Sequence, residues 1–388
     1  MLAPLGLTPS FGFGDRLGLA TPGHIAAVTG TKLAPIFAQQ SVRENARTGR
    51  TPQQVIDDAR RAVEAAGWTG AWGADADHLK TVDDLPPFVA AGYTFYTIDP
   101  GAQVDNSADA AAVPLLQSKT KDRADWGDLR AVYLQKAAIP GLPAFEVETL
   151  LRAMVKYGPA IDHAVTMYRR LSELMQAFDF EVSVDETDAP TTPLEHYFIA
   201  NELRRRGVNF TSLAPRFTGR FEKGVDYIGD LAALDVEMAK HAAVTAHFGT
   251  YKLSLHSGSD KFSVYPLIRK HWGDRIHVKT AGTSYLEALR TLAVAEPALF
   301  GQIWALAIER YPLDRASYHV SAQIDKVPPD TAGPSLLDDF HAREILHVTF
   351  GSVLAQYGAQ IKGALVKHMG AYDANLRRHF QRHLKLLE

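Results

Sequence analysis

The feature that most constrains the fold of this 388-residue chain is a strand–helix unit that recurs along it. Each unit joins a short run of strand-forming residues to a longer segment with apolar residues at helical spacing. The clearest run, 251–256, alternates apolar residues and stops at His256, where a Ser-Gly-Ser-Asp turn follows. Buried strands that alternate with helices are typical of parallel α/β folds.

Eight of these runs fit strands, and polar residues stand at their ends. The predicted strands are 11–19, 33–41, 70–78, 93–99, 180–186, 209–215, 251–256 and 276–280. Eight units favour a (β/α)8 barrel of the TIM type over an open sheet. A ninth candidate at 317–321 exceeds the eight places, and we interpret it as an accessory piece near the rim.

Between the strands, the sequence predicts helices with recognisable ends. Thr51 is placed to cap a helix, Pro52 stands at its first position, and Gly67 ends it. The rhythm breaks at 101–178, which we interpret as a helical insertion or an unusually long connection. We interpret 1–388 as a single catalytic barrel domain with a helical C-terminal extension at 336–388. This extension either packs on the outside or builds a contact in a homo-oligomer.

Composition limits the class of protein. The chain is 46% hydrophobic and 22% charged, with a net charge of −3, so we expect neither nucleic acid nor an anionic membrane as partner. The absence of cysteine excludes disulfides, thiolate zinc sites and cysteine nucleophiles. No apolar run is long enough for a membrane helix, and the first residues do not resemble a secretory signal. We therefore expect a cytoplasmic enzyme acting on a small molecule.

In a (β/α)8 barrel the carboxyl ends of the strands converge at one face, where the active site lies. Burying unpaired charges there costs roughly several kcal/mol per ion, so a dense polar ring indicates a functional site. The predicted ring contains Asp15, Arg16, Gln39, Asp75, Asp77, His78, Asp99, Asp185, Glu186, Arg216, His256, Ser257, Ser259, Asp260, Lys279 and Thr280.

His78, Glu186 and His256 form a plausible two-His, one-carboxylate set for a divalent metal. Such a set leaves open positions for substrate oxygens. The ligand types fit zinc, manganese, nickel, cobalt or iron and do not choose among them. His319 is a spare ligand candidate. The histidines in helical or loop contexts we interpret as structural or surface residues: His24, His163, His347, His379 and His383.

Other residues of the ring are candidates for proton transfer and substrate binding. Asp77 is placed either to act as a general acid and base or to orient a neighbouring His. Arg216 and Lys279 would hold a carboxylate, and Lys279 as a Schiff-base nucleophile is the alternative. The remaining candidates for substrate binding are Arg16, Gln39, Ser257, Ser259 and Asp260.

Two motifs resemble those of class II sugar aldolases. The pair Asp77-His78 is similar to their Asp-His pair, in which the Asp handles protons and the His binds the metal. The run 253–259 is similar to their metal-ligand strand and the turn of small residues after it. That family places another metal-binding His on the preceding strand, and 212–216 has none, so we assign Glu186 as the third ligand.

A further resemblance covers nearly the whole chain. Seven long strings are similar to the tagaturonate epimerase family: 11–25, 74–81, 201–217, 251–266, 277–290, 316–320 and 346–354. The resemblance implies an isomerase that interconverts D-tagaturonate and D-fructuronate at C4 with a divalent metal, in hexuronate catabolism. It also implies that related members act on tagatose and fructose.

For that reaction we expect a retro-aldol route, because the C4 hydrogen of a 2-keto sugar acid is not α to the ketone. The metal would chelate the ketone and a neighbouring hydroxyl, and Asp77 would take the C4 hydroxyl proton. Arg216 or Lys279 would hold the C6 carboxylate. Serines 257 and 259 and Asp260 would bind hydroxyls.

Three alternatives remain open from the sequence. One is a class II-type aldolase or ketose isomerase acting on neutral or phosphorylated ketohexoses such as tagatose. Another is oxidation at C4 by a bound nicotinamide. The glycines of 12–18 do not support it, because they lie inside a strand rather than opening a helix after one. The third is a sugar-acid binding protein without activity.

Overall fold

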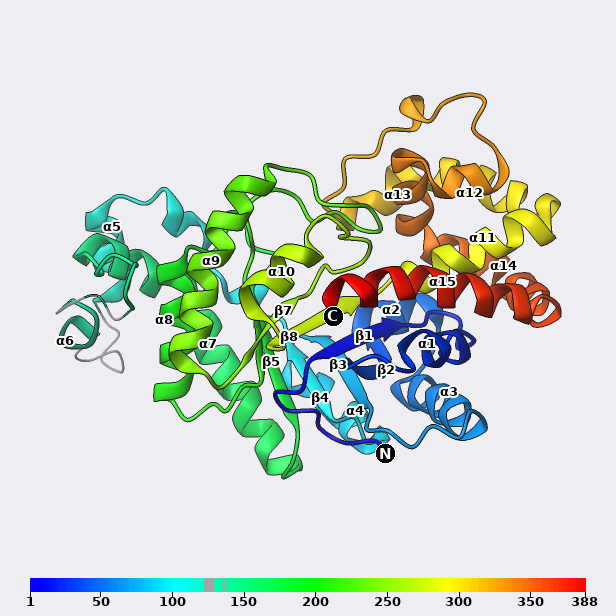
Figure 1. Ribbon diagram of the computed structural model, residues 1–388. Helices are drawn as coiled ribbons and strands as arrows, with labels where there is room; N and C mark the ends of the chain where they lie inside the picture. The colour runs from blue at the N-terminus through cyan, green and yellow to red at the C-terminus, as the bar shows by residue number, and fades with distance from the viewer. Residues whose placement is uncertain (122–128, 135–136, 138) are drawn as a thin grey trace.

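Eight strands form one closed parallel sheet. They are β1 Ser10–Gly14, β2 Ala34–Ser41, β3 Gly73–Leu79, β4 Phe95–Ile98, β5 Asp179–Ser183, β6 Ser212–Ala214, β7 Lys252–Leu255 and β8 Ile276–Thr280. The computed structural model describes residues 1–121, 129–134, 137 and 139–388. The strands pair in sequence order, and β8 returns to pair with β1 (Figure 1). The predicted (β/α)8 barrel is confirmed.

Helices surround the barrel and extend beyond it. They are α1 Thr21–Val28, α2 Val42–Thr48, α3 Pro52–Ala65, α4 Leu85–Ala91, α5 Val113–Thr120, α6 Leu129–Tyr133, α7 Val147–Leu174, α8 Pro193–Arg205, α9 Leu231–Phe248, α10 Tyr265–Trp272, α11 Thr283–Ala295, α12 Pro297–Asp314, α13 Phe340–Val348, α14 Phe350–Lys367 and α15 Met369–Leu387. Helix α3 begins as its sequence predicts, since the Thr51 side chain accepts the Gln54 N–H at 3.2 Å and Pro52 is its first residue.

The segment 101–178 is a long connection that contains one of the barrel's own helices. Helix α7, 28 residues long, leads into β5 and packs beside α8 in the outer layer (Figure 1). Helix α5 lies against it through a small separate cluster formed by Ala108, Leu116, Leu151 and Val155. At 122–128, 135–136 and 138 the predicted helical insertion lies outside the described residues.

The ninth strand candidate, 317–321, is not a strand. It follows a short 3-10 turn at Arg315–Ser317 and runs as irregular chain along the mouth of the barrel. The Ser321 N–H and hydroxyl both donate to Glu222, each at 2.8 Å, so a side chain takes the place of a ladder partner. The alternation of residue types that suggested a strand therefore belongs to an irregular segment, which we call the 317–321 strap.

The C-terminal extension is helical, as predicted, and its last helix packs on the barrel. Helix α15 crosses the outer face of β1 and lies against α1 (Figure 1). The Phe380 ring stands edge-on to the rings of Phe13 and His24, with 5.0 Å between centroids in each case. Aromatic contacts of this kind add to the burial that fixes the helix.

The interior of the barrel carries charged side chains. Alternate residues of a strand face inward, so Asp75 and Asp77 of β3 enter the same space as Glu181 of β5 and Lys279 of β8. All four are buried. Asp77 and Lys279 lie near the carboxyl ends of β3 and β8, so this charged group leads to the end of the barrel where the site is expected.

A substitution in α1 tests the packing of α15. A Cβ at Gly23 would lie 2.6 Å from Leu376 Cβ, so Gly23→Ala forces the two helices apart. We expect a loss of about 1–3 kcal/mol in the free energy of unfolding, as for other overpacked contacts. Thermal unfolding measures it. Gly301→Ala, in α12 with nothing within 4 Å, is the matched control and should leave stability equal or higher. Equal midpoints for both variants would contradict the contact.

Candidate active site

Three side chains with metal-binding atoms converge at the mouth of the barrel. Among the described residues, ligand atoms of Asp77, His78 and His256 all lie within 4.8 Å of one another. The His256 Nε2 atom is 3.4 Å from Asp77 Oδ1, and the His78 Nε2 atom is 4.0 Å from Asp77 Oδ2. The predicted pair His78 and His256 is therefore together, and Asp77 completes the group.

The backbone at the end of β3 turns both Asp77 and His78 toward the mouth. Successive side chains of a strand point to opposite faces, so two neighbours reach one site only where the strand bends. His78 has a φ of 53°, in the left-handed region that residues other than glycine rarely adopt. Such local strain clusters at functional sites, where the surrounding structure holds it.

Asp99, at the end of β4, fixes the ring of His78. Its Oδ2 atom lies 3.4 Å from His78 Nδ1, which leaves Nε2 directed at Asp77. The carboxylate is itself held by the Gly101 N–H at 2.9 Å and by Lys80 at 3.3 Å. A carboxylate that binds the second nitrogen of a His is the usual companion of a metal-binding imidazole.

Lys279 is enclosed by carboxylates beneath this group. Its ammonium lies 2.7 Å from Asp75, 2.9 Å from Asp77 and 3.0 Å from Glu181, and it also donates to Thr97. Burial lowers the pKa of Lys279, but the three carboxylates outweigh it and raise the pKa well above its usual range. This corrects the prediction for Lys279, because an ammonium with all its protons engaged neither attacks a ketone nor binds a substrate carboxylate.

The charge around His256 is dominated by acids. Its Nδ1 atom lies 3.5 Å from Glu181 and 3.9 Å from Asp185, opposite the contact with Asp77. Burial lowers the pKa of His256, but Asp185 and Asp77 outweigh it and raise the pKa to about 10. Four carboxylates share this region with one lysine, so the site favours additional positive charge.

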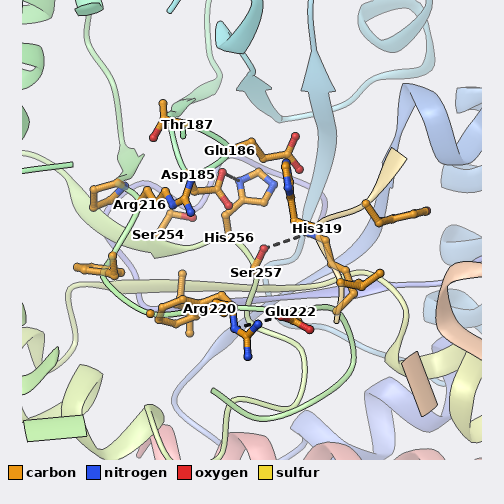
Figure 2. Close-up of a pocket in the computed structure, with 18 of the residues that line it drawn as sticks. Asp185, Glu186, Thr187, Arg216, Arg220, Glu222, Ser254, His256, Ser257 and His319 are labelled. Atoms are coloured by element: carbon orange, nitrogen blue, oxygen red, sulfur yellow. Dashed lines mark hydrogen bonds and ion pairs between the residues drawn. The ribbon is translucent and has the colours of Figure 1, made fainter. Parts of the chain in front are cut away.

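A wide cavity of about 420 Å³ opens on one side of His256. Figure 2 shows Asp185 pointing at the His256 ring, with Arg216 and Ser254 on one side of it and His319 on the other. The Lys223 ammonium also lines this outer cavity and donates to Ser257 at 3.1 Å. The cavity walls come from the loops after β5, β6 and β7 and from the 317–321 strap.

A second cavity, of about 30 Å³, lies on the other side of the two histidines. We call it the inner cavity. It shares His256 and Lys223 with the outer cavity. Its other walls are Arg16, Gln39, Ser41, Arg43, Glu44, Asp77, His78, Lys279, Ala281, Tyr318 and His347.

Most of the predicted site residues lie at one of these two cavities. Arg16 and Gln39 line the inner one, and Arg216 and Ser257 line the outer one. Glu186 and His319 also line the outer cavity, but neither belongs to the convergent group of metal-binding atoms. Both side chains are exposed. Glu186 lies in the loop beyond β5, which ends at Ser183.

The predicted substrate-binding residues Asp260 and Ser259 line neither of the two cavities. The backbone of Asp260 has a φ of 60°, which turns the side chain away from the mouth. Its carboxylate accepts a hydrogen bond from Arg343 at 3.0 Å and contacts the His379 ring. The Ser259 hydroxyl accepts the Ala281 N–H at 3.3 Å. The turn bends because Gly258 lies directly on β8, where a Cβ would be 2.8 Å from Lys279 O.

Sequence reasoning missed three groups of the site. Glu181 lies inside β5 and not at its end, so a search of strand ends passes over it. Lys223 belongs to the loop after β6, and the nearby basic residue Arg220 was the signal that this loop could supply positive charge to the site. His347 comes from α13 in the extension and carries no signal, because its helical pattern is that of a core residue.

A parallel barrel with two histidines and a carboxylate at its mouth, beside a polar cavity, defines an enzyme that acts on a small polar molecule. Comparison with known proteins makes this specific. The family model for tagaturonate epimerase, UxaE, matches residues 3–387. The chain belongs to the tagaturonate epimerase family and is accordingly an isomerase of the carbohydrate epimerase class.

Individual relatives agree along the full chain. A tagaturonate/fructuronate epimerase from Thermotoga maritima is 44% identical over 99% of this chain and 81% of its own length. The glycerol-complexed crystal structure of fructuronate-tagaturonate epimerase UxaE from Cohnella laeviribosi is 39% identical, with a TM-score of 0.96 over 100% of this chain and 83% of that one. The native crystal structure of the same protein gives a TM-score of 0.95. Within the described residues, no helix is long and apolar enough to cross a membrane.

Replacing the enclosed lysine tests the charge balance. Lys279→Met leaves Asp75, Asp77 and Glu181 buried without their cation, so we expect a loss of about 3–5 kcal/mol in the free energy of unfolding. Denaturant unfolding measures it. Lys80→Met removes a lysine whose side chain is 65% exposed and should change stability by less than about 1 kcal/mol. Similar losses in the two variants would show that the enclosed lysine has no special role.

Proposed function

We propose that this enzyme interconverts D-tagaturonate and D-fructuronate by inverting C4, with a divalent metal at the mouth of the barrel. The observation that carries the proposal is the full-length match to epimerases named for these two substrates. The convergent side chains Asp77, His78 and His256, with a wide cavity beside them, supply suitable chemistry. Carbons are numbered here from the hydroxymethyl end, so the ketone is C2 and the carboxylate C6.

The donor set fits a divalent metal. Two imidazoles and a carboxylate are typical ligands of zinc, manganese, nickel, cobalt and iron, and they leave positions open for substrate oxygens. Asp77 replaces Glu186 as the third donor in this proposal, because its oxygens lie among the two rings and those of Glu186 do not. The orienting contact from Asp99 to His78 supports the same assignment.

Inversion at C4 requires a route other than deprotonation, because C4 is not adjacent to the ketone. A divalent metal held there would act as a Lewis acid on the ketone oxygen. In a retro-aldol step the C3–C4 bond breaks, its electron pair forms the enediolate of the C1–C3 fragment, and C4 becomes an aldehyde. Readdition of C3 to the opposite face of the aldehyde gives the other epimer.

The proton of the C4 hydroxyl must leave during cleavage and return during readdition. We assign this transfer to Glu186, which lines the outer cavity. Asp77 is less suited, because Lys279 and His256 already engage its Oδ1 atom at 2.9 and 3.4 Å. One carboxylate thus takes the proton and gives it back, and no other reactant is consumed.

The outer cavity gives the aldehyde fragment room to turn. It holds about 420 Å³, within the range of small-molecule sites, while the C4–C6 fragment has only seven non-hydrogen atoms, roughly a third of that volume. Arg216 and Lys223 line this cavity and would hold the C6 carboxylate as the aldehyde turns over. Attachment at the carboxylate keeps the fragment in place between the two steps.

Metal dependence tests the proposal directly. Protein stripped with EDTA should be inactive on D-tagaturonate, and one or more of the five metals should restore formation of D-fructuronate, followed by NMR. His78→Ala and His256→Ala should each lower metal affinity at least about 10-fold and turnover at least about 100-fold. Metal content, measured by plasma emission, gives a readout independent of turnover.

Matched variants in the outer cavity separate the roles. His319→Ala should keep its metal, because His319 lies outside the convergent group. Glu186→Gln should also keep the metal but lose turnover by about 10²–10⁴-fold, the usual contribution of a general acid–base group. Loss of metal from Glu186→Gln would show that Glu186 is a ligand, and conversion that continues in EDTA would contradict the metal-dependent route.

The choice of substrate is tested separately. Conversion of D-tagatose but not D-tagaturonate would reassign the substrate to the neutral ketose.

The fate of the C4 hydrogen distinguishes the bond-breaking routes. In a retro-aldol reaction this hydrogen stays on the aldehyde carbon, so epimerisation in D₂O should give a product with no deuterium at C4. Proton NMR of the product measures this. Deuterium at C4 would instead require deprotonation there. Because oxidation and reduction by a bound cofactor would also retain the hydrogen, labelled dihydroxyacetone is added in parallel, and its incorporation into C1–C3 identifies carbon–carbon cleavage.

A further inference from the structure

The inner cavity is surrounded by buried polar groups that lack partners. Within the described part of the chain, Arg16 Nη1, Gln39 Oε1 and both ring nitrogens of His347 form no hydrogen bond. All three side chains are at most 3% exposed. Buried polar atoms are nearly always paired, so several unpaired ones around one small cavity indicate a ligand that completes them.

We propose that the inner cavity is the subsite for the uncharged hydroxymethyl end of the substrate, and that His347, Arg16 and Gln39 bind it there. The proposal rests on the epimerase function argued above and adds the direction in which the substrate lies. It assigns the C1 hydroxyl to the inner cavity and the C6 carboxylate to the outer one.

His347 is held firmly against the inner cavity. Its ring lies on the turn after β8, where a Cβ at Gly282 would be only 2.0 Å from Nε2. Gly224 lies against the ring from the loop after β6, and a Cβ there would be 3.2 Å from Cδ2. Burial, followed by the charges of Arg16 and Lys223, lowers the pKa of His347 well below its usual value, so the ring is neutral. A neutral imidazole offers one donor and one acceptor, which matches a hydroxyl group.

Arg16 supplies a donor without net charge. Its Nε and Nη2 atoms each lie 2.8 Å from Glu44 Oε1, and its guanidinium stacks on the Phe350 ring at 3.6 Å. Glu44 is also buried, so the pair is neutral as a whole. The remaining Nη1 is free to donate to an oxygen of a ligand, and it does not carry an uncompensated charge for a carboxylate.

Gln39 supplies an acceptor on another wall. Its amide nitrogen donates to Thr280 O at 3.1 Å, which fixes the amide so that Oε1 is left without a donor. With His347 and Arg16, Gln39 therefore offers this cavity donors and acceptors that match one hydroxyl group. Its volume of about 30 Å³ exceeds the roughly 10–15 Å³ that one water needs, so it accommodates a hydroxymethyl group but not a sugar chain.

The outer cavity is much larger and has a cation of its own in addition to the shared Lys223. Lys223 donates to the Ser257 hydroxyl and has no carboxylate within ion-pair distance among the described residues. The Arg216 side chain, in the same part of the chain that the structure describes, has neither an ion pair nor a hydrogen bond. Arg216 lines the outer cavity and not the inner one, so it suits a substrate carboxylate that lies there. The orientation also follows from size, because the outer cavity, of about 420 Å³ against about 30 Å³, has the room for the half of the substrate that turns over.

A substrate without the C1 hydroxyl tests the assignment. The ratio of kcat/KM for D-tagaturonate to that for 1-deoxy-D-tagaturonate measures how strongly the site recognises that group. We expect a ratio of about 100 or more for the unmodified enzyme, since sites that pair a substrate hydroxyl reject analogues lacking it. His347→Leu should lower the ratio at least 10-fold. His341→Gln, on the same helix but outside both cavities, should leave it unchanged.

A second variant and a binding measurement keep the test decisive. Gln39→Met replaces the acceptor on the other wall and should also lower the ratio, which covers a failure of His347→Leu to fold. NMR titration with dihydroxyacetone, which carries only the hydroxymethyl ketone end, reports on the subsite without turnover. The metal-loaded enzyme should bind it at least 10-fold more tightly than either variant does.

The outcomes separate this proposal from the epimerase function. Folded variants with unchanged ratios and unchanged dihydroxyacetone binding would overturn the subsite while leaving the epimerase function intact. Variants that lose the preference for D-tagaturonate over D-tagatose, and keep recognition of the C1 hydroxyl, would reverse the orientation. If the unmodified enzyme converts no tagaturonate with any metal, the proposed function fails, and the binding titration still decides whether the inner cavity takes a hydroxymethyl ketone.

Discussion

The ion cluster around Lys279 is the interaction on which the rest of the site depends. Strand β3 sends two carboxylates and β5 sends one to a single ammonium inside the barrel, and none of the four groups is more than 6% exposed in its side chain. Ions buried in this way cost free energy unless each is paired and hydrogen-bonded, so the cluster exists only as a whole. It fixes one oxygen of Asp77 and leaves the other toward His78. The cluster thereby joins the barrel interior to the chemistry at its mouth.

The C-terminal extension holds the other half of the site. The turn after β7 follows directly from His256, and its Asp260 N–H donates to His383 Nε2 at 3.1 Å. Arg343 and His379 bind the carboxylate of the same residue from α13 and α15. Asp260, His379 and His383 also lie close enough to hold a metal, but Arg343 already supplies positive charge there. We interpret this group as an anchor that fixes the turn beside His256.

The sequence was sufficient for the fold because its signals are local. Strand runs, Thr51 as a cap and Gly67 as a stop depend on neighbouring residues, and the structure has the elements they predict. The pair His78 and His256 was predictable because strand ends of a barrel converge. Asp260 was not, since its left-handed backbone and its contacts with α13 and α15 depend on residues more than 80 positions away. The same distance in sequence hid His347, which belongs to the site only through the packing of α13.

The proposed chemistry places different demands on the two halves of the substrate. An aldolase releases its aldehyde fragment, whereas an epimerase must keep that fragment while it turns over and then rejoin it to the other half. A small cavity with fixed polar walls suits the half that stays, because movement of that half would take C3 out of position for attack on the aldehyde carbon. A wide cavity suits the half that turns, provided that a charge holds its far end. Arg216 and Lys223, which have no carboxylate partner among the residues that the structure describes, line the wide cavity, and Lys223 stands between it and the narrow one. Reaction type in such a barrel would then follow from how tightly each fragment is held, with the convergent side chains at the mouth unchanged.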